Sequence, residues 1–84
     1  MTFHIEVEER AVRELLDLPK EASQRIRSTI SRLAQSSRPP GAKKLTGRGG
    51  YRVRVGDYRI LYEIDDASKL VRIYKVGHRK DVYR

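Results

Sequence analysis

Three arginines in one short segment and a group of polar residues at the C-terminus are the side chains best suited to chemistry in this sequence. The segment YRVRVGDYRILY, residues 51–62, alternates apolar and polar residues on either side of Gly56 and Asp57. This pattern predicts a β-hairpin with a two-residue type II′ turn, and that turn places Arg54 directly opposite Arg59. Like charges that face each other destabilise a sheet. The pair therefore indicates a function that requires concentrated positive charge.

The C-terminal sequence GHRKDVYR adds groups that could act on the same ligand. A guanidinium binds phosphate through a planar fork, stays charged at ordinary pH and stacks on bases. His78 carries an imidazole that titrates near neutral pH, and Tyr83 could stack on a nucleobase. If the C-terminal residues fold over the sheet edge, His78, Arg79 and Tyr83 lie near Arg54 and Arg59. Each residue alone has an ordinary structural interpretation, whereas the combination favours an RNA-binding site.

The charge of the chain is unevenly distributed. The net charge is +8, and residues 1–37 hold six Lys/Arg and six Asp/Glu, whereas residues 38–84 hold thirteen and five. All of the excess positive charge therefore lies in the half that contains the hairpin, which is typical of a protein that binds nucleic acid. Further RNA contacts are expected from the basic residues around the hairpin, namely Lys43, Lys44, Arg48, Arg52 and Lys80.

Several classes of protein are excluded by composition. The chain has no cysteine, which excludes a disulfide scaffold. It offers no carboxylate cluster for a metal ion, and we expect neither metal nor cofactor. No apolar run reaches the roughly 18 residues of a membrane span, and the acidic N-terminal region does not look like a signal peptide. We expect a cytoplasmic protein without membrane contact.

The elements that must position these residues follow from hydrophobic periodicity. Residues 2–7 alternate as a strand, residues 8–18 and a segment after Pro19 have helical spacing, and residues 36–50 form a Pro- and Gly-rich loop. The hairpin and a strand at 69–76 complete the order β-α-α-β-β-β. This order predicts one α+β domain over residues 1–84, with a small antiparallel sheet and a helical hairpin on one face.

The two faces of the sheet are predicted to differ. Apolar residues at alternate positions of 51–64 face the helices, so Arg52, Arg54 and Arg59 point away from them. In the strand 69–76, Val71 and Ile73 are expected on one face, and Leu70, Tyr74 and Val76 on the other. A strand that is apolar on both faces is central, so the N-terminal strand is expected along its free edge. The face of the sheet that carries Arg52, Arg54 and Arg59 is expected to be covered only by the C-terminal residues.

The motifs resemble those of the RelE/ParE toxin superfamily, more closely its RelE branch. The resemblance rests on YRVRVGDYRILYEI and VGHRKDVY in the C-terminal half, with EERAVRELLDLP and AKKLTG before them, and it spans essentially the whole chain. It implies a toxin of a type II toxin–antitoxin pair. RelE-like toxins cut messenger RNA in the ribosomal decoding site and are neutralised by an antitoxin. The implied partners are therefore a cognate antitoxin, the ribosome and messenger RNA.

The resemblance also implies individual roles. The basic strand residues of the family fall on Arg52 and Arg54, its phosphate-binding arginine on Arg59, its C-terminal arginine on Arg79 and its terminal tyrosine on Tyr83. Several family members carry lysine where Arg52, Arg54 and His78 stand. Since arginine does not readily release a proton, His78 becomes the candidate acid or base. The implied reaction is metal-free attack of the RNA 2′-hydroxyl on the adjacent phosphate.

Two other functions fit the same residues. A ParE-like inhibitor of DNA gyrase would share the fold without needing nuclease residues, although Arg79 and Tyr83 favour the nuclease. A non-catalytic RNA-binding module would require only the basic face. Cut messenger RNA, trapped gyrase–DNA complexes or neither would distinguish the three.

Overall fold

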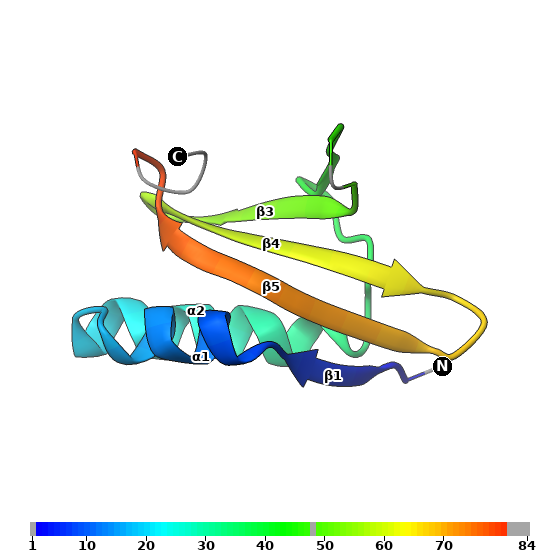
Figure 1. The fold of residues 1–84 in the computed structure, drawn as a ribbon, viewed down its shortest axis with the longest axis horizontal. Coiled ribbons are helices and arrows are strands. Elements are labelled where there is room, and N and C mark those ends of the chain that lie inside the picture. The colour runs from blue at the N-terminus through cyan, green and yellow to red at the C-terminus, as the bar shows by residue number, and fades with distance from the viewer. Residues whose placement is uncertain (1, 48, 81–84) are drawn as a thin grey trace.

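The structure is a computed structural model that describes residues 2–47 and 49–80. In this part of the chain, two helices pack on one face of a five-stranded sheet (Figure 1). The elements are β1 (His4–Val7), α1 (Glu9–Leu16), α2 (Lys20–Leu33), β2 (Lys43–Lys44), β3 (Tyr51–Val55), β4 (Tyr58–Asp65) and β5 (Leu70–His78). The predicted α+β fold with a helical hairpin on one face is confirmed.

The sheet is mixed, and this differs from the antiparallel sheet predicted. The strand order is β1-β5-β4-β3-β2, and β1 pairs with β5 in parallel. The N–H of Phe3 donates to the carbonyl of Ala34 at 2.8 Å, so α2 ends beside the start of β1. The chain then crosses to the far edge of the sheet, where β3, β4 and β5 alternate in direction. As a result, β5 runs parallel to β1. The N-terminal strand β1 lies along the free edge of β5, as predicted.

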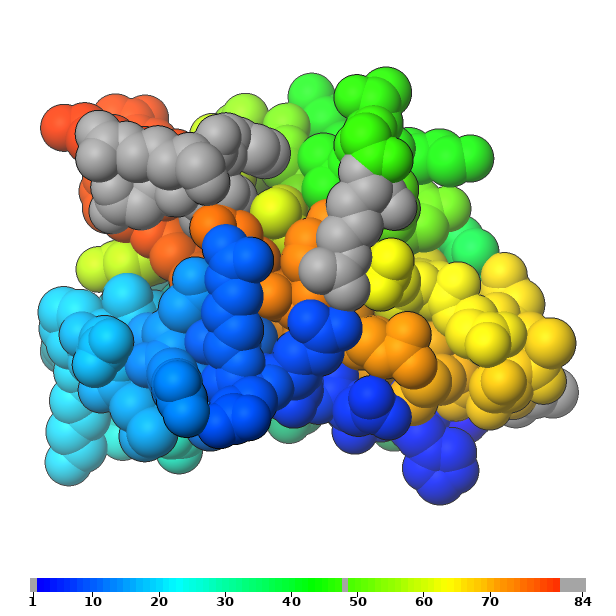
Figure 2. All heavy atoms as spheres, in the orientation of Figure 1, coloured from blue at the N-terminus to red at the C-terminus, as the bar shows by residue number. Residues whose placement is uncertain are grey.

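The core lies between the helices and the sheet. Ile26 and Leu33 of α2 are almost completely buried, as are Ile60 and Tyr62 of β4. Figure 2 shows the side chains of α1 and β1, in blue, lying against those of β5, in orange. Complete burial of an aliphatic side chain contributes roughly 1.5–3 kcal/mol. This core between the helices and the sheet therefore holds in place the strands that carry the arginines.

A β-bulge in β5 changes which side chains reach each face. Leu61 pairs with Lys75 while Tyr62 pairs with Ile73, so Tyr74 is the additional residue. Such a residue reverses the alternation of the strand beyond it. Val76, predicted on the face opposite Val71 and Ile73, instead joins them in the helix-facing core. The N–H of Val76 donates to Oε1 of Glu14 in α1 at 2.9 Å, which ties the bulged strand to the helix layer.

The face opposite the helices is partly covered by the loop between β2 and β3, contrary to the prediction that only the C-terminal residues cover it. Leu45 packs against Leu61 and Tyr74 in a second apolar cluster, and the hydroxyl of Tyr74 donates to the Gly49 carbonyl at 3.1 Å. Gly50 has φ +87°, and a Cβ there would collide with the carbonyl of Tyr62. Glycine is therefore required where this loop meets the sheet.

A polar clamp around Arg38 holds the preceding loop. The Arg38 guanidinium donates to both carboxylate oxygens of Asp66, at 3.2 and 2.9 Å, and to the hydroxyl of Tyr51 at 3.0 Å. Its hydrogen bond holds the pKa of Asp66 below the ordinary value. Tyr51 stacks on Tyr62 with ring centres 5.9 Å apart, and the Tyr62 hydroxyl donates to the Ser37 carbonyl at 2.8 Å. Burial raises the pKa of Tyr62 to about 12. The clamp anchors the chain that leads into β2.

Candidate nucleic-acid interface

The centre of the candidate interface is a row of three residues across β3, β4 and β5. Arg54 pairs with Arg59, as the hairpin predicted, and Arg59 pairs with Gly77. The turn before Arg59 has φ +59° at Gly56, the left-handed conformation that a type II′ turn requires at its first central position. Since Gly77 carries no side chain, the row presents two guanidinium groups. Its chemistry suits an anion that spans both groups.

A second row of cations runs beside the first. Lys43 of β2 pairs with Arg52 of β3, Arg52 pairs with Leu61 of β4, and Leu61 pairs with Lys75 of β5. Directly paired residues share a face of the sheet. Arg52, Lys75 and the two arginines of the first row therefore belong to one face, with Leu61 as an apolar residue among them. Lys44, the other β2 residue of the predicted RNA-binding set, is exposed and pairs with Tyr51.

Arg59 contains an unusual donor. Its Nε is buried and donates no hydrogen bond to any residue that the structure describes. Buried side-chain donors are normally paired, because an unpaired one costs about 1–3 kcal/mol. An outside ligand cannot reach this atom in the present conformation, so Arg59 holds an incompletely satisfied guanidinium directly opposite Arg54.

Carboxylates pair with arginines at other positions of the described chain. Arg13 pairs with Glu9 at 2.7 Å, Arg38 with Asp66 at 2.9 Å, and Arg72 with Glu6 at 3.2 Å. Within residues 2–47 and 49–80, no Asp or Glu oxygen lies within 4.0 Å of a guanidinium nitrogen of Arg52, Arg54 or Arg59. The positive charge of this face is therefore available to a ligand. We call Arg52, Arg54, Arg59 and Lys75 the arginine face.

The bulge separates His78 from the arginine face. His78 pairs with Tyr58, a helix-facing residue, and the two rings meet edge to face with centres 5.7 Å apart. Nδ1 of His78 accepts the N–H of Lys80 at 3.2 Å. This bond assigns the proton of the neutral ring to Nε2 and occupies its basic nitrogen. The structure thus brings Arg54 and Arg59 together as expected but places His78 on the other side of β5.

The remaining predicted residues lie at the end of β5. The N–H of Arg79 donates to the carbonyl of Asp57 at 2.9 Å, which holds Arg79 beside the β3–β4 turn. Arg79 and Lys80 are exposed. Arg48 and Tyr83 lie outside the described residues.

The sequence pattern does not indicate Lys75 as a member of the arginine face. Regular alternation from Val71 assigns it to the helix side, and only the additional residue Tyr74 moves it to the arginine face. The strand sequence KLVRIYKV contains no glycine that would signal a bulge. The face on which Lys75 lies is therefore set by the pairing of β5 with β4 and not by the local sequence pattern.

Two further features, a cluster of metal ligands and a membrane-spanning helix, are not found in the described residues. Within the described residues, no group of three or more His, Asp or Glu side chains could hold a metal ion. No helix in this part of the chain is long and apolar enough to cross a membrane.

Comparison with known proteins gives consistent matches over nearly the whole chain. Residues 5–83 match the family model described as the ParE toxin of the type II toxin–antitoxin system parDE. The RelE1 protein of Methanocaldococcus jannaschii is 28% identical over 88 residues, covering 100% of this chain and 98% of the relative.

Two solved structures have the same fold at similar identity. One is a chain in the RelE–RelB complex of Pyrococcus horikoshii, with a TM-score of 0.84, 28% identity, and coverage of 98% of this chain and 100% of that chain. The other is in the toxin–antitoxin complex RelBE2 of Mycobacterium tuberculosis, with a TM-score of 0.84, 28% identity, and coverage of 96% and 95%.

Proposed function

The chain belongs to the ParE toxin family of type II toxin–antitoxin systems, and we propose that it is a RelE-like toxin that cleaves messenger RNA on the ribosome. The facing pair Arg54 and Arg59 carries this proposal. Two arginines on directly paired residues, neither in an ion pair with any residue that the structure describes, match the extra negative charge that a phosphate acquires during cleavage. A protein that only had to stay folded would gain by losing one of them.

The proposed reaction is transesterification within the RNA strand. The 2′-hydroxyl oxygen attacks the adjacent phosphorus, the bond to the 5′-oxygen breaks, and the products are a 2′,3′-cyclic phosphate and a 5′-hydroxyl end. One proton leaves the 2′-oxygen and one reaches the 5′-oxygen, so no metal ion or redox cofactor is consumed. Arg54 and Arg59 bind the non-bridging oxygens, which become more negative in the transition state.

The other residues have supporting roles in this proposal. Arg79, held at the turn beside this row, stabilises the leaving 5′-oxygen. Arg52, Lys75 and Lys43 bind neighbouring phosphates along the second row. Tyr83 orients the nucleotide by stacking. His78, which the sequence favours as the proton-transfer group, would have to release its Nδ1 bond and turn past β5 to reach the phosphate.

A protein partner follows from the relatives. The two solved structures are toxin–antitoxin complexes, one of them of RelE with RelB. We propose that a cognate antitoxin likewise binds and neutralises this chain. Inhibition of DNA gyrase is the second candidate, because the matching family model is named for ParE.

The test compares the reactions directly. Purified protein is incubated with programmed ribosomes, with the same messenger RNA free in solution, and with gyrase and supercoiled DNA. We expect cuts on ribosome-bound messenger RNA, detected by primer extension, and their loss in Arg54→Gln/Arg59→Gln. The control Arg10→Gln/Arg13→Gln removes the same charge from α1 and should cut normally. Trapped gyrase–DNA complexes, or equal cutting of free RNA, would contradict the proposal.

A further inference from the structure

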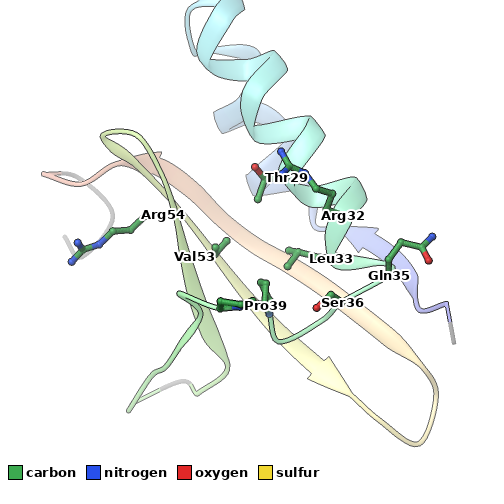
Figure 3. A pocket seen from close by; sticks show the side chains of 9 residues that line it. Thr29, Arg32, Leu33, Gln35, Ser36, Pro39, Val53 and Arg54 are labelled. Atoms are coloured by element: carbon green, nitrogen blue, oxygen red, sulfur yellow. The ribbon is translucent and has the colours of Figure 1, made fainter.

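A groove separates α2 from β3, the strand that carries Arg54, and it is lined by cations on both sides. Two adjoining hollows of about 520 and 450 Å³ share Thr29, Arg32 and Arg54 in their linings. Each has the size of a small-ligand site. Figure 3 shows the first hollow, with Leu33 of α2 and Val53 of β3 on its two sides and Pro39 at one end. The groove runs from this apolar end towards Gly56 at the hairpin turn.

The α2 side of the groove presents two arginines on one helix face. Arg25 and Arg32 are seven residues apart, two helical turns, so their backbones lie about 10 Å apart along the axis. A side chain at Gly56 would come within 3.3 Å of Nη1 of Arg25, which shows that the guanidinium reaches across to the hairpin turn. Ser28 and Thr29, between the arginines, add hydroxyl groups.

Within the described residues, no carboxylate pairs with these two arginines. The linings of both hollows contain no Asp or Glu. Within the described ranges 2–47 and 49–80, neither guanidinium forms an ion pair, whereas Arg10, Arg13, Arg38 and Arg72 each do. Arg25 and Arg32 are both exposed. The groove therefore offers uncompensated positive charge over an apolar floor.

The groove continues from the arginine face around the edge of the sheet. Arg54 lines both hollows, yet Figure 3 shows its side chain extending away from α2. A strand of RNA bound on the arginine face would meet Arg54 at the edge of β3 and then Arg32 and Arg25 beyond it. Phosphates fit the guanidinium groups, and an unstacked base fits the apolar floor with Val53 and Pro39.

We infer that this groove between α2 and β3 is a second binding site for single-stranded RNA, in which Arg25 and Arg32 hold backbone phosphates outside the cleaved linkage. The inference rests on the proposed function for its ligand class, and it adds a binding surface separate from the reacting phosphate. Double-stranded nucleic acid fits less well, because its bases are not free to enter the apolar floor.

The test measures binding without cleavage. The probe is a short single-stranded oligoribonucleotide with 2′-O-methyl groups on every sugar, which removes the attacking hydroxyl. Its affinity for the full chain is titrated over a range of salt concentrations. The variant Arg25→Gln/Arg32→Gln removes both groove cations. The control Lys20→Gln/Arg27→Gln removes the same charge from exposed positions of α2 that lie outside both hollows.

The groove variant should bind the probe roughly tenfold or more weakly, as expected when hydrogen bonds to charged groups are lost. Its slope of log K against log salt should be shallower by roughly 1.4, the value for two phosphate contacts on a single strand. The control should keep both values nearly unchanged, and circular dichroism should show that both variants are folded.

Three outcomes would overturn the inference. The wild type could fail to bind the probe, the two variants could lose affinity equally, or the groove variant could bind RNA normally while losing its antitoxin, which would make the groove a peptide site. Because the probe cannot be cleaved, a chain that binds through the groove but does not cut ribosomal messenger RNA would reject the proposed function alone.

Discussion

Replacing Arg59 should stabilise the fold while it removes activity. In Arg59→Met the aliphatic stem is kept, the charge opposite Arg54 disappears, and the buried Nε without a partner is removed. Relief of like-charge repulsion is worth about 0.5 kcal/mol, and removal of an unpaired buried donor at least about 1 kcal/mol. At roughly 4–8 °C per kcal/mol for a domain of this size, the melting temperature should rise by about 6 °C or more.

The same variant should be a poor nuclease. Loss of one preorganised donor to the transition state lowers the rate about 10²–10³-fold. Melting is followed by circular dichroism, and cleavage by single-turnover primer extension with the protein in excess over programmed ribosomes. The matched control is Lys75→Met, which removes a cation from the same face but from a position opposite Leu61. It should show no comparable stabilisation.

The result that refutes this reasoning is a melting temperature that stays the same or falls in Arg59→Met. Arg59 would then have an unrecognised stabilising partner, and the facing pair would be an ordinary structural feature. A stabilised variant with wild-type cleavage would refute the other half, because the charge would then serve no catalytic purpose.

Three further predictions address single residues. Arg79→Ala should lower the single-turnover rate about 10²–10³-fold with a much smaller change in ribosome affinity; a parental rate would remove Arg79 from the mechanism. Tyr62→Phe should lose about 1 kcal/mol with the hydrogen bond to Ser37. Because the folded-state pKa of Tyr62 is raised, the contribution of its hydroxyl to the free energy of unfolding is complete below pH 10 and is lost as the pH rises towards 12. Urea unfolding at pH 9 and 11.5 should show this decline in the wild type and not in the variant. His78→Gln should cleave messenger RNA at a rate within a few-fold of the wild-type rate. The imidazole lies off the arginine face, and glutamine still offers an acceptor to the Lys80 N–H. A 100-fold loss of rate, with disappearance of a pH-dependent step, would instead make His78 the base.

The hairpin could be predicted from sequence because its determinants are local. A two-residue turn with glycine first fixes the register of the strands on both sides, so the pairing of Arg54 with Arg59 follows from counting. The helix-facing apolar residues follow from the same alternation. Local chemistry thus determines the central feature of the candidate site.

The direction of β1 and the existence of β2 could not be predicted in the same way. Whether β1 lies parallel or antiparallel to β5 depends on where α2 ends relative to Phe3, a contact between distant parts of the chain. The two residues of β2 lie in a Pro- and Gly-rich loop, and their pairing with β3 depends on how the Arg38 clamp places that loop. Neither has a periodic pattern of its own.

The bulge at Tyr74 links the fold to the composition of the site. Without the additional residue, His78 would share a face with Arg59 and Lys75 would point towards the helices; with it, the two exchange sides. Glu14 holds the strand from the helix side through the Val76 amide, and the Gly49 carbonyl holds Tyr74 from the other. Contacts from two separate layers therefore fix a single backbone irregularity. Since that irregularity places the ammonium of Lys75, rather than the imidazole of His78, on the arginine face, it adds a second kind of cationic contact for phosphate to a surface otherwise made of guanidinium groups.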